Sequence, residues 1–408
     1  MIDIKLLREN REKVKKACEN KGAKIDIDKV LELDKNKREV IKKTEELRAQ
    51  RARTEYAPEK EAELRKLKDD IKKGEQKRDE LNLKFQVSFN QIPNLPLDDV
   101  PIGSNETGNK VIKAVGKTEK GLRDYMEIAE KLDIIDVKRA AKTSGSRFGY
   151  LKGDLAILEF GLVRLAFDVL GKEGFIPVIP PVMIKPEMAK GMGYIEQTNS
   201  EEAYYINSDN LYLIGTSEQS LGAMHADEIF NENELPKRYV GFSTCFRREA
   251  GSYGKDTKGI LRVHQFDKVE MFSFCKPEDS IKEHKFLLSL EEKLMNLLKI
   301  PYRVVQMCTG DLGHPAAAKY DIEAWFPGQN EYRETHSTSS CTDFQARRLN
   351  IKYKTKNGLE FVHTLNGTAF AIGRTLIAII ENYQQKDGSI KVPKVLRKYT
   401  GIKCIVTK

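Results

Sequence analysis

The sequence of 408 residues predicts an α+β protein in two unlike parts, a helical hairpin followed by a domain of mixed helices and short strands. The charge distribution predicts the division. Residues 1–100 hold 26 Lys and Arg and 22 Asp and Glu, whereas the other 308 residues hold 44 and 39. The apolar residues predict the element types, because they recur at helical spacing in the first part and at strand spacing in the second.

Two long helices are expected in the first part, over residues 27–54 and 59–91. Proline is tolerated only at the start of a helix, so Pro58 predicts the break between them. The apolar residues follow a three-and-four spacing, which is typical of a seam between two helices; they are Val30, Leu33, Val40 and Leu47, and Leu67, Ile71, Leu81 and Phe85. Gly74 interrupts this seam. The sequence therefore predicts an antiparallel coiled-coil arm that buries little besides its own seam.

A segment rich in proline and glycine follows, from Ile92 to about Gly108, and it reads as a linker. We expect a domain boundary near residue 105, with domains over 1–105 and 106–408. The second domain opens with a helix around 152–170. The prolines of the next segment, 175–182, favour an edge or interface strand.

Two predicted strands, 239–249 and 263–274, are joined by a long loop rich in glycine and charge. Their period of two places Arg247 and Glu249 on one face, and groups Phe266 with Lys268 and Glu270. Guanidinium, carboxylate and phenyl groups together suit an anionic ligand with a planar ring. An exposed hairpin with ordinary cross-strand ion pairs explains the same spacing equally well.

Three more polar segments have both a structural and a functional interpretation. Thr216 and Gln219 fit a helix capping box, which is a sufficient reason for both residues. Glu334 lies among hydroxyl and imidazole groups that could surround Mg²⁺ bound to phosphates, or it could simply be solvated. Arg374 lies near the start of an apolar helix over 370–383, where the helix dipole disfavours a cation, so it either reaches solvent or serves a ligand.

Several protein classes are excluded at this stage. No apolar run is long enough to cross a membrane, and the first 13 residues lack the apolar core of a secretory signal, so we expect a cytoplasmic protein without membrane contact. The six cysteines contain no Cys-x-x-Cys pair and the six histidines are dispersed, so no zinc is expected. No glycine fingerprint of a dinucleotide fold follows a strand.

In this order the segments resemble the class II aminoacyl-tRNA synthetases, and closely the bacterial-type seryl-tRNA synthetases, over essentially the whole chain. The three class motifs resemble Gly174–Val182 with Pro181, Phe246–Glu249, and Gly373–Arg374. More specific is the run Cys245–Glu270, CFRREAGSYGKDTKGILRVHQFDKVE, which is similar to the seryl branch almost throughout. The resemblance implies an antiparallel-sheet catalytic core preceded by a tRNA-binding arm.

The resemblance also implies a role for each matching residue. Arg247 and Arg374 would be catalytic, through contacts with the phosphates. The residues implied for L-serine are Thr216, Ser217, Glu218, Glu270 and Thr368. Those implied for ATP are Arg247, Arg248, Glu249, Val263, Phe266, Glu334, Thr335, His336, Ser337 and Arg374, and Glu334 and Ser337 would also hold Mg²⁺. Gly215, Ser217 and Thr368 stand where the family often has other residues, all at the amino-acid pocket.

The implied activity is activation of serine by ATP and transfer of the seryl group to tRNA(Ser), with tRNA(Sec) as a further partner, by a homodimer. One rival is another class II enzyme or an amino acid ligase that charges a carrier protein, but a threonyl enzyme would need zinc ligands and a carrier ligase would lack the arm. The other rival is a non-catalytic basic coiled-coil protein. Such a protein should have lost the ATP residues, yet they are present together.

Overall fold

The computed structural model describes residues 1–195, 202–250 and 258–407, in two compact units, Met1–Leu95 and Pro96–Lys408. The boundary between them in the chain follows Leu95, ten residues before the expected boundary near 105. Residues 96–105 belong to the second unit because Leu97 N donates to Ala317 O (2.9 Å) and Gly103 N donates to the Thr309 hydroxyl (3.2 Å). Residues 251–257, part of the expected loop between two strands, lie outside the described residues.

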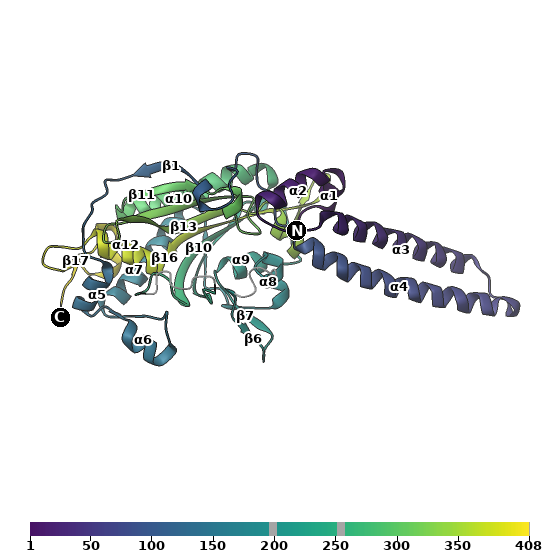
Figure 1. Cartoon of the computed structure of the whole chain (residues 1–408), viewed down its shortest axis with the longest axis horizontal. Coiled ribbons are helices and arrows are strands. Elements are labelled where there is room, and N and C mark those ends of the chain that lie inside the picture. The colour runs from purple at the N-terminus through teal and green to yellow at the C-terminus, as the bar shows by residue number, and fades with distance from the viewer. Residues whose placement is uncertain (196–201, 251–257, 408) are drawn as a thin grey trace. The chain divides into compact units, whose positions relative to one another are not determined.

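The first unit is helical, as predicted. Its long helices run side by side in Figure 1. The Asp26 carboxylate caps the first of them by accepting from Lys29 N at 3.0 Å, and a short 3₁₀ turn at Pro58–Lys60 begins the return. The helices are α1 (Ile4–Glu9), α2 (Arg11–Asn20), α3 (Ile27–Arg53) and α4 (Glu61–Asn90).

Five of the eight predicted seam residues of α3 and α4 are buried, and Leu33, Val40 and Leu47 are half-buried; the five are Val30, Leu67, Ile71, Leu81 and Phe85. The interruption of the seam at Gly74 has a structural cause. A Cβ at Gly74 would lie 2.3 Å from the Thr44 hydroxyl, so this is a point where the helices approach too closely for a side chain.

Among the described residues of the second unit, eight strands form the main sheet, in which neighbours are antiparallel except β4 and β9. Strand β4 is an edge strand and carries Pro177, as the prolines of that segment predicted. In sheet order the strands are β1 (Lys110–Val115), β11 (Tyr302–Gln306), β12 (Ala318–Phe326), β13 (Glu331–Ser340), β16 (His363–Ala371), β10 (Gln265–Cys275), β9 (Lys237–Phe246) and β4 (Ile176–Val178).

Three helices pack together with one face of this sheet, α7 (Asp154–Lys172), α10 (Ser280–Leu298) and α12 (Ile372–Asn382) (Figure 1). Their apolar residues form the main core with the alternate residues of the strands, among them Val269 and Met271 of β10. Because successive side chains of a strand point to opposite faces, Lys268 and Glu270 of β10 point away from the helices, whereas Ser273 lies on the helix face and donates to Glu283 of α10 at 2.8 Å. The tertiary structure thus confirms the two faces predicted for this strand.

Short elements complete the second unit. Figure 1 shows several of them around the main sheet. The remaining strands are β2 (Ile135–Asp136), β3 (Tyr150–Leu151), β5 (Met183–Ile184), β6 (Tyr205–Ile206), β7 (Leu211–Leu213), β8 (Ile229–Phe230), β14 (Lys352–Thr355), β15 (Gly358–Phe361), β17 (Ile390–Lys391) and β18 (Cys404–Ile405). The remaining helices are α5 (Tyr125–Leu132), α6 (Val137–Ser144), α8 (Pro186–Met192), α9 (Glu218–Ala223), α11 (Phe344–Leu349) and α13 (Arg397–Thr400).

Two predicted boundaries are wrong in an informative way. Strand β9 ends at Phe246, so Arg247 and Glu249 follow the strand instead of sharing one of its faces. Helix α12 begins at Ile372, because Phe370 still pairs with Val269 in the sheet.

The capping box interpretation of Thr216 and Gln219 is also wrong. The N-cap of α9 is Ser217; Thr216 Oγ1 accepts from Glu218 N (3.3 Å), and Gln219 Oε1 accepts from Gly215 N (3.0 Å). These hydrogen bonds form a turn at the start of α9, and the side chains of Thr216 and Glu218 line a cavity.

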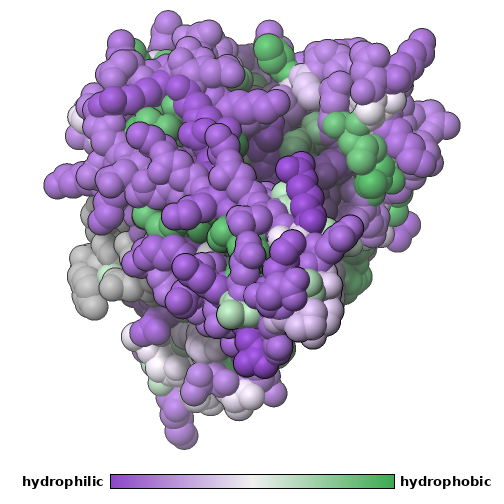
Figure 2. All heavy atoms as spheres, turned by 90° about the vertical axis from the view of Figure 1, so that its right-hand side faces the viewer, coloured by the Kyte–Doolittle hydropathy of each residue, from purple (hydrophilic) through white to green (hydrophobic). Residues whose placement is uncertain are grey.

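The surface shown in Figure 2 is largely hydrophilic, as expected from the high share of charged residues in the sequence. On the face drawn in Figure 2 most side chains are hydrophilic, and hydrophobic ones gather in a few patches. None of the helices in the described residues combines the length and the apolar character needed to cross a bilayer.

Candidate active site

A cavity of about 260 Å³ lies on the polar side of β10, β13 and β16, open to solvent at one side. It brings together most of the residues that the resemblance marks, although they come from segments up to about 160 positions apart. Those that line it are Thr216, Glu218, Arg247, Glu249, Val263, Phe266, Glu270, Glu334, Thr335, Ser337, Thr368 and Arg374.

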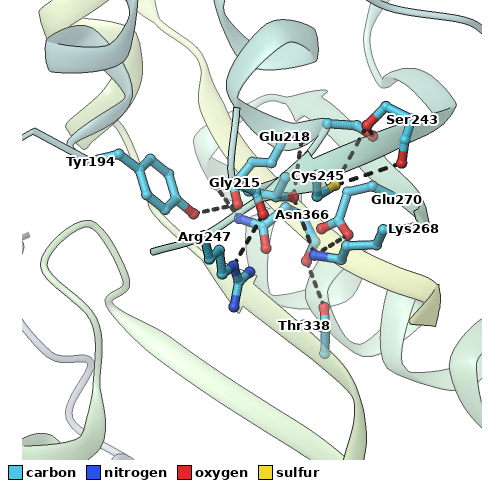
Figure 3. A network of polar contacts seen from close by, with 12 residues as sticks. Tyr194, Gly215, Glu218, Ser243, Cys245, Arg247, Lys268, Glu270, Thr338 and Asn366 are labelled. Carbon is cyan, nitrogen blue, oxygen red and sulfur yellow. Dashed lines mark hydrogen bonds and ion pairs between the residues drawn. The ribbon is translucent and has the colours of Figure 1, made fainter. Parts of the chain in front are cut away.

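One end of the cavity is built around the Glu218 carboxylate, at the start of α9. Figure 3 shows Tyr194 and Asn366 directed at it. Tyr194 Oη donates to one carboxylate oxygen (2.5 Å), while Asn366 Nδ2 (2.9 Å) and Gln345 Nε2 (3.1 Å) donate to the other. Since the side chain is 3% exposed, these donors hold Glu218 in one orientation inside the protein.

A second buried carboxylate lies near Glu218 on β10. Lys268 Nζ lies 2.5 Å from Glu270 Oε2 (Figure 3). It also donates to the Thr216 hydroxyl at 3.2 Å, so one ammonium joins two of the predicted serine ligands. Thr368, opposite Glu270 on β16, hydrogen-bonds the same carboxylate. This end of the cavity therefore presents two carboxylates, one ammonium and two hydroxyls within an enclosed wall.

Burial controls the electrostatics at this end. It raises the pKa of Glu218, against the hydrogen bond from Tyr194 and the charge of Lys268. Burial also raises the pKa of Glu270 to about 7, because the loss of hydration and the charge of Glu218 outweigh the attraction of Lys268. A bound cation would relieve both carboxylates, so this end is suited to an amino group.

The other end is more open and carries arginines. The Arg247 guanidinium lies 5.2 Å from the centre of the Phe266 ring, and its Nε donates to Gly215 O at 3.2 Å. Glu249 adopts a left-handed backbone conformation (φ 54°) and its carboxylate accepts from Arg262 at 3.1 Å. Such a conformation in a residue other than glycine is strained and is often found at functional sites.

An ion pair lies at the mouth of this end. Arg374 Nη1 donates to Glu334 Oε2 at 3.1 Å and to Glu334 O at 2.9 Å. Loss of hydration raises the pKa of Glu334, but the positive charges of Arg374 and Lys319 outweigh that effect and lower the pKa to about 2. Arg374 near the start of α12 thus reaches across to β13, which explains a cation at that position.

Three of the predicted ligands do not line the cavity. Ser217 is fully buried and its hydroxyl is bonded to that of Ser243 at 2.8 Å. The Arg248 guanidinium lies 6.0 Å from the Tyr204 ring, and His336 is buried with its Nδ1 against the Thr335 hydroxyl at 2.9 Å.

Four residues of the site were given no role from the sequence: Tyr194, Lys268, Gln345 and Asn366. A signal existed for three of them. The alternation along β10 had placed Lys268 beside Glu270, and Gln345 and Asn366 lie in segments that resemble the family. Tyr194 had no such signal, because it lies in none of the segments on which the resemblance was based and is 24 positions from Glu218.

The described residues contain no group of three His, Cys, Asp or Glu side chains arranged to hold a metal ion. Glu334 and Ser337 nevertheless both present oxygen to the cavity. One carboxylate with one hydroxyl is a small ligand set, of the kind that Mg²⁺ completes with phosphate oxygens and water.

Comparisons with known proteins agree with this geometry. The model of the seryl-tRNA synthetase N-terminal domain matches residues 1–96, and that of the tRNA synthetase class II core domain (G, H, P, S and T) matches 203–383. The serine-tRNA ligase of Acidothermus cellulolyticus is 46% identical over 98% of both chains, and that of Dictyoglomus thermophilum is 44% identical over 100% of both.

Solved structures give the same result. The chain is similar to seryl-tRNA synthetase from Pyrococcus horikoshii complexed with ATP, with a TM-score of 0.93 and 41% identity over 100% of both chains. It is also similar to the cytoplasmic serine-tRNA ligase of Naegleria fowleri in complex with AMP, with a TM-score of 0.87, 36% identity, and coverage of 100% of this chain and 99% of that one.

Proposed function

The chain belongs to the seryl-tRNA synthetases of class II and so activates serine with ATP and charges tRNA(Ser), and we propose that both steps take place in the cavity described above. One observation carries this proposal. A single cavity joins an enclosed end with two carboxylates, Glu218 and Glu270, to an open end with Arg247 and Arg374. The first end suits an amino acid and the second suits a triphosphate.

In this proposal serine binds at the enclosed end. Glu218 and Glu270 receive its ammonium group, and Thr216 and Thr368 supply hydroxyls for its polar atoms. The serine hydroxyl is recognised by a buried polar group, so an analogue without it, such as alanine, leaves that group unpaired. Discrimination of about 10⁴-fold is then possible without a separate editing step.

ATP occupies the open end. Phe266 offers a ring face to adenine, with Val263 beside it, and Glu249 accepts from its amino group. Arg247 lies between the two ends and is assigned to the α-phosphate and the serine carboxylate, while Arg374 is assigned to the terminal phosphate. The contributions of Arg248, Thr335 and His336, and of Ser217 at the serine end, stay predictions from the resemblance.

The chemistry needs little from the side chains beyond position and charge. A carboxylate oxygen of serine attacks the α-phosphorus, the bond to the bridging oxygen breaks, and diphosphate leaves. No proton is removed from the nucleophile, so no general base is required. Arg247 orients the two reacting groups and stabilises charge on the α-phosphate. In the second step the tRNA ribose oxygen attacks the carbonyl carbon of the seryl-adenylate, the bond from that carbon to the phosphate oxygen breaks, and AMP leaves with the hydroxyl proton on its phosphate.

Mg²⁺ fits this proposal at Glu334 and Ser337. Glu334 is ionised at neutral pH because its pKa is lowered to about 2 by Arg374 and Lys319 against the opposing effect of the surrounding protein. When bound, Mg²⁺ would neutralise charge on the phosphates. Glu334 also holds Arg374 through its backbone oxygen, so that contact does not depend on the carboxylate.

The arm, residues 1–105 in the predicted division, is proposed to bind tRNA. Helices α3 and α4 expose charged side chains of both signs, which suits recognition of an RNA shape more than bulk attraction. The edge strand β4 is proposed to lie in a homodimer interface. We also propose that the enzyme transfers the seryl group to tRNA(Sec) and that it is located in the cytoplasm.

The central test separates the two ends. Arg247→Ala should abolish serine-dependent ATP–diphosphate exchange, since one residue contacts both substrates, while the thermal unfolding midpoint stays near that of the wild type. Retained exchange would remove the role given to Arg247. Exchange driven better by threonine or alanine than by serine would contradict the assignment of the enclosed end.

A second test concerns the arm. Deletion of residues 27–90 should impair charging of tRNA(Ser) and leave ATP–diphosphate exchange near its wild-type rate, because none of the cavity residues lies in the arm. Equal charging with and without these residues would refute a tRNA role for the arm.

A further inference from the structure

Residues 260–263 form one wall of the open end of the cavity, and the start of the segment 258–263 is held by a side chain that no assignment above uses. This is Tyr125, the first residue of α5, which is 3% exposed. Its hydroxyl accepts from Ile260 N at 2.9 Å and donates to Lys258 O at 3.3 Å. Two backbone groups at the start of this wall therefore depend on a single phenol oxygen.

Gly259, between these two backbone groups, is required for the contact. A Cβ at Gly259 would lie 1.9 Å from Tyr125 Oη and 2.7 Å from its Cζ, and the residue has a φ of +72°. Both facts favour glycine, because no other residue could approach the phenol so closely. The chain is thus shaped here around the tyrosine hydroxyl.

The backbone of Tyr125 is held by α12. Its N–H has no partner within α5, because it belongs to the first turn, and it donates to Glu381 Oε1 of α12 at 3.2 Å. The other oxygen of Glu381 accepts from Gly328 N at 2.8 Å. Since α12 carries Arg374 near its start, Tyr125 is bonded to both the segment 258–260 and the helix that presents Arg374.

The two walls also approach each other directly. A Cβ at Gly373 would lie 3.6 Å from Ile260 O, which is ordinary van der Waals contact. Any shift of Ile260 away from Tyr125 would therefore change the gap beside Arg374 and the width available to an adenine on Phe266. The ring of Tyr125 packs in the main core, so its hydroxyl can be tested apart from its packing.

We propose that Tyr125 is a positioning residue for ATP, whose hydroxyl fixes the segment 258–263 against the start of α12 so that Val263, Phe266 and Arg374 enclose the nucleotide. This inference rests on the proposed assignment of the open end to ATP. The serine end does not depend on Tyr125, because Glu218 is held by Tyr194, Gln345 and Asn366 instead.

Tyr125→Phe tests the hydroxyl alone in the full-length enzyme. The variant leaves Ile260 N–H without its partner, and we expect the KM for ATP in ATP–diphosphate exchange to rise about tenfold, with the KM for serine changed less than about twofold. Tyr383→Phe is the matched control, because its hydroxyl also donates to a backbone carbonyl, Leu298 O at 2.5 Å, away from the cavity. Its KM for ATP should stay at the wild-type value.

Two outcomes would overturn the proposal: an unchanged KM for ATP in Tyr125→Phe, or an equal rise in both KM values with a larger loss of thermal stability than in the control. Phe266→Ala, measured alongside, separates the two levels of inference. If it raises the KM for ATP and Tyr125→Phe does not, the role of Tyr125 is refuted and the ATP site stands. If neither variant raises it, the assignment of ATP to this end is refuted.

Gly259→Ala provides an independent variant. It keeps the tyrosine but places a methyl group against Tyr125 Oη, so it should raise the KM for ATP at least as much as Tyr125→Phe. A wild-type KM for ATP in Gly259→Ala would show that the wall need not approach the phenol, and the proposal would fall.

Discussion

The two ends of the cavity differ most in their exposure to water. Thr216, Glu218 and Glu270 are 2%, 3% and 1% exposed, whereas the side chains of Glu334 and Arg374 are 46% and 28% exposed. The ends also differ in the charges beside their carboxylates, whose pKa values shift in opposite directions. Burial raises the pKa of Glu270 to about 7, while neighbouring cations lower that of Glu334 to about 2 against the opposing effect of its surroundings.

This difference corresponds to the two substrates. Serine is small and must be distinguished from close analogues, and an enclosed pocket penalises an analogue because its polar groups then lack partners. ATP is large and leaves as diphosphate and AMP, so an open end with exposed charges allows entry and release. We therefore expect substitutions at the enclosed end to have the larger effects on specificity.

Among substitutions confined to one end of the cavity, the largest effect is expected for Glu218→Gln. The substitution removes the charge that receives the serine ammonium and places a second amide beside Asn366 and Gln345, and loss of one partner of a buried ion pair costs about 3–5 kcal/mol. The kcat/KM for serine in ATP–diphosphate exchange should fall about 10³-fold, with the KM for ATP little changed.

Glu291→Gln is the matched control for that variant. Glu291 of α10 is fully buried, and burial raises its pKa well above the usual range, so glutamine resembles its neutral form. We expect serine kinetics within about twofold of the wild type. A loss as large as that of Glu218→Gln would mean that buried charge near the sheet matters in general, and the comparison of the two ends would lose its basis.

A smaller effect is expected at the open end, for Arg374→Ala. One charge contact to a developing phosphate charge is worth about 10²-fold in rate. The kcat of exchange should fall by about that factor and the KM for ATP should rise, while the KM for serine stays the same. An effect on serine alone would reverse the assignment of the two ends.

The kinetic constants for serine and ATP should depend differently on pH, with a change of about tenfold per pH unit below 7 in the kcat/KM for serine. Serine binding requires ionised Glu270, whose pKa is raised by burial to about 7, so kcat/KM for serine should fall as the pH decreases below 7. The KM for ATP should show no matching change due to Glu334. The folded state binds the Glu270 proton more tightly than the unfolded state, so stability from this group is lost as the pH rises through 7. A flat profile for serine would contradict the role of Glu270.

The smallest effect is expected for Ser217→Ala. This side chain is bonded to Ser243 inside the protein and not directed into the cavity. We expect a loss of about 1 kcal/mol in the free energy of unfolding and serine kinetics within about twofold of the wild type. A large rise in the KM for serine would return Ser217 to the pocket.

Prediction from the sequence was most accurate where a pattern is local. The helix pair α3 and α4 and the two faces of β10 were predicted because apolar spacing reports burial directly. The end of β9 and the start of α12 were misplaced, since pairing with neighbouring strands decides them. Ser217 and Glu218 are adjacent in the chain, and no local pattern tells which of the two side chains points into the cavity.

The helical arm follows from apolar periodicity and charge composition, and the class of the protein and most of the residues that meet in the cavity follow from the motifs that resemble the family. Three contacts could be seen only in the folded chain: Lys268 joins Thr216 to Glu270, Tyr194 holds Glu218, and Tyr125 binds both the segment 258–260 and α12. The physical reason is that such contacts depend on distance in space. A hydrogen bond or a pKa shift acts over a few ångströms, and residues that distant in the chain reach that range only when the sheet and its helices have formed.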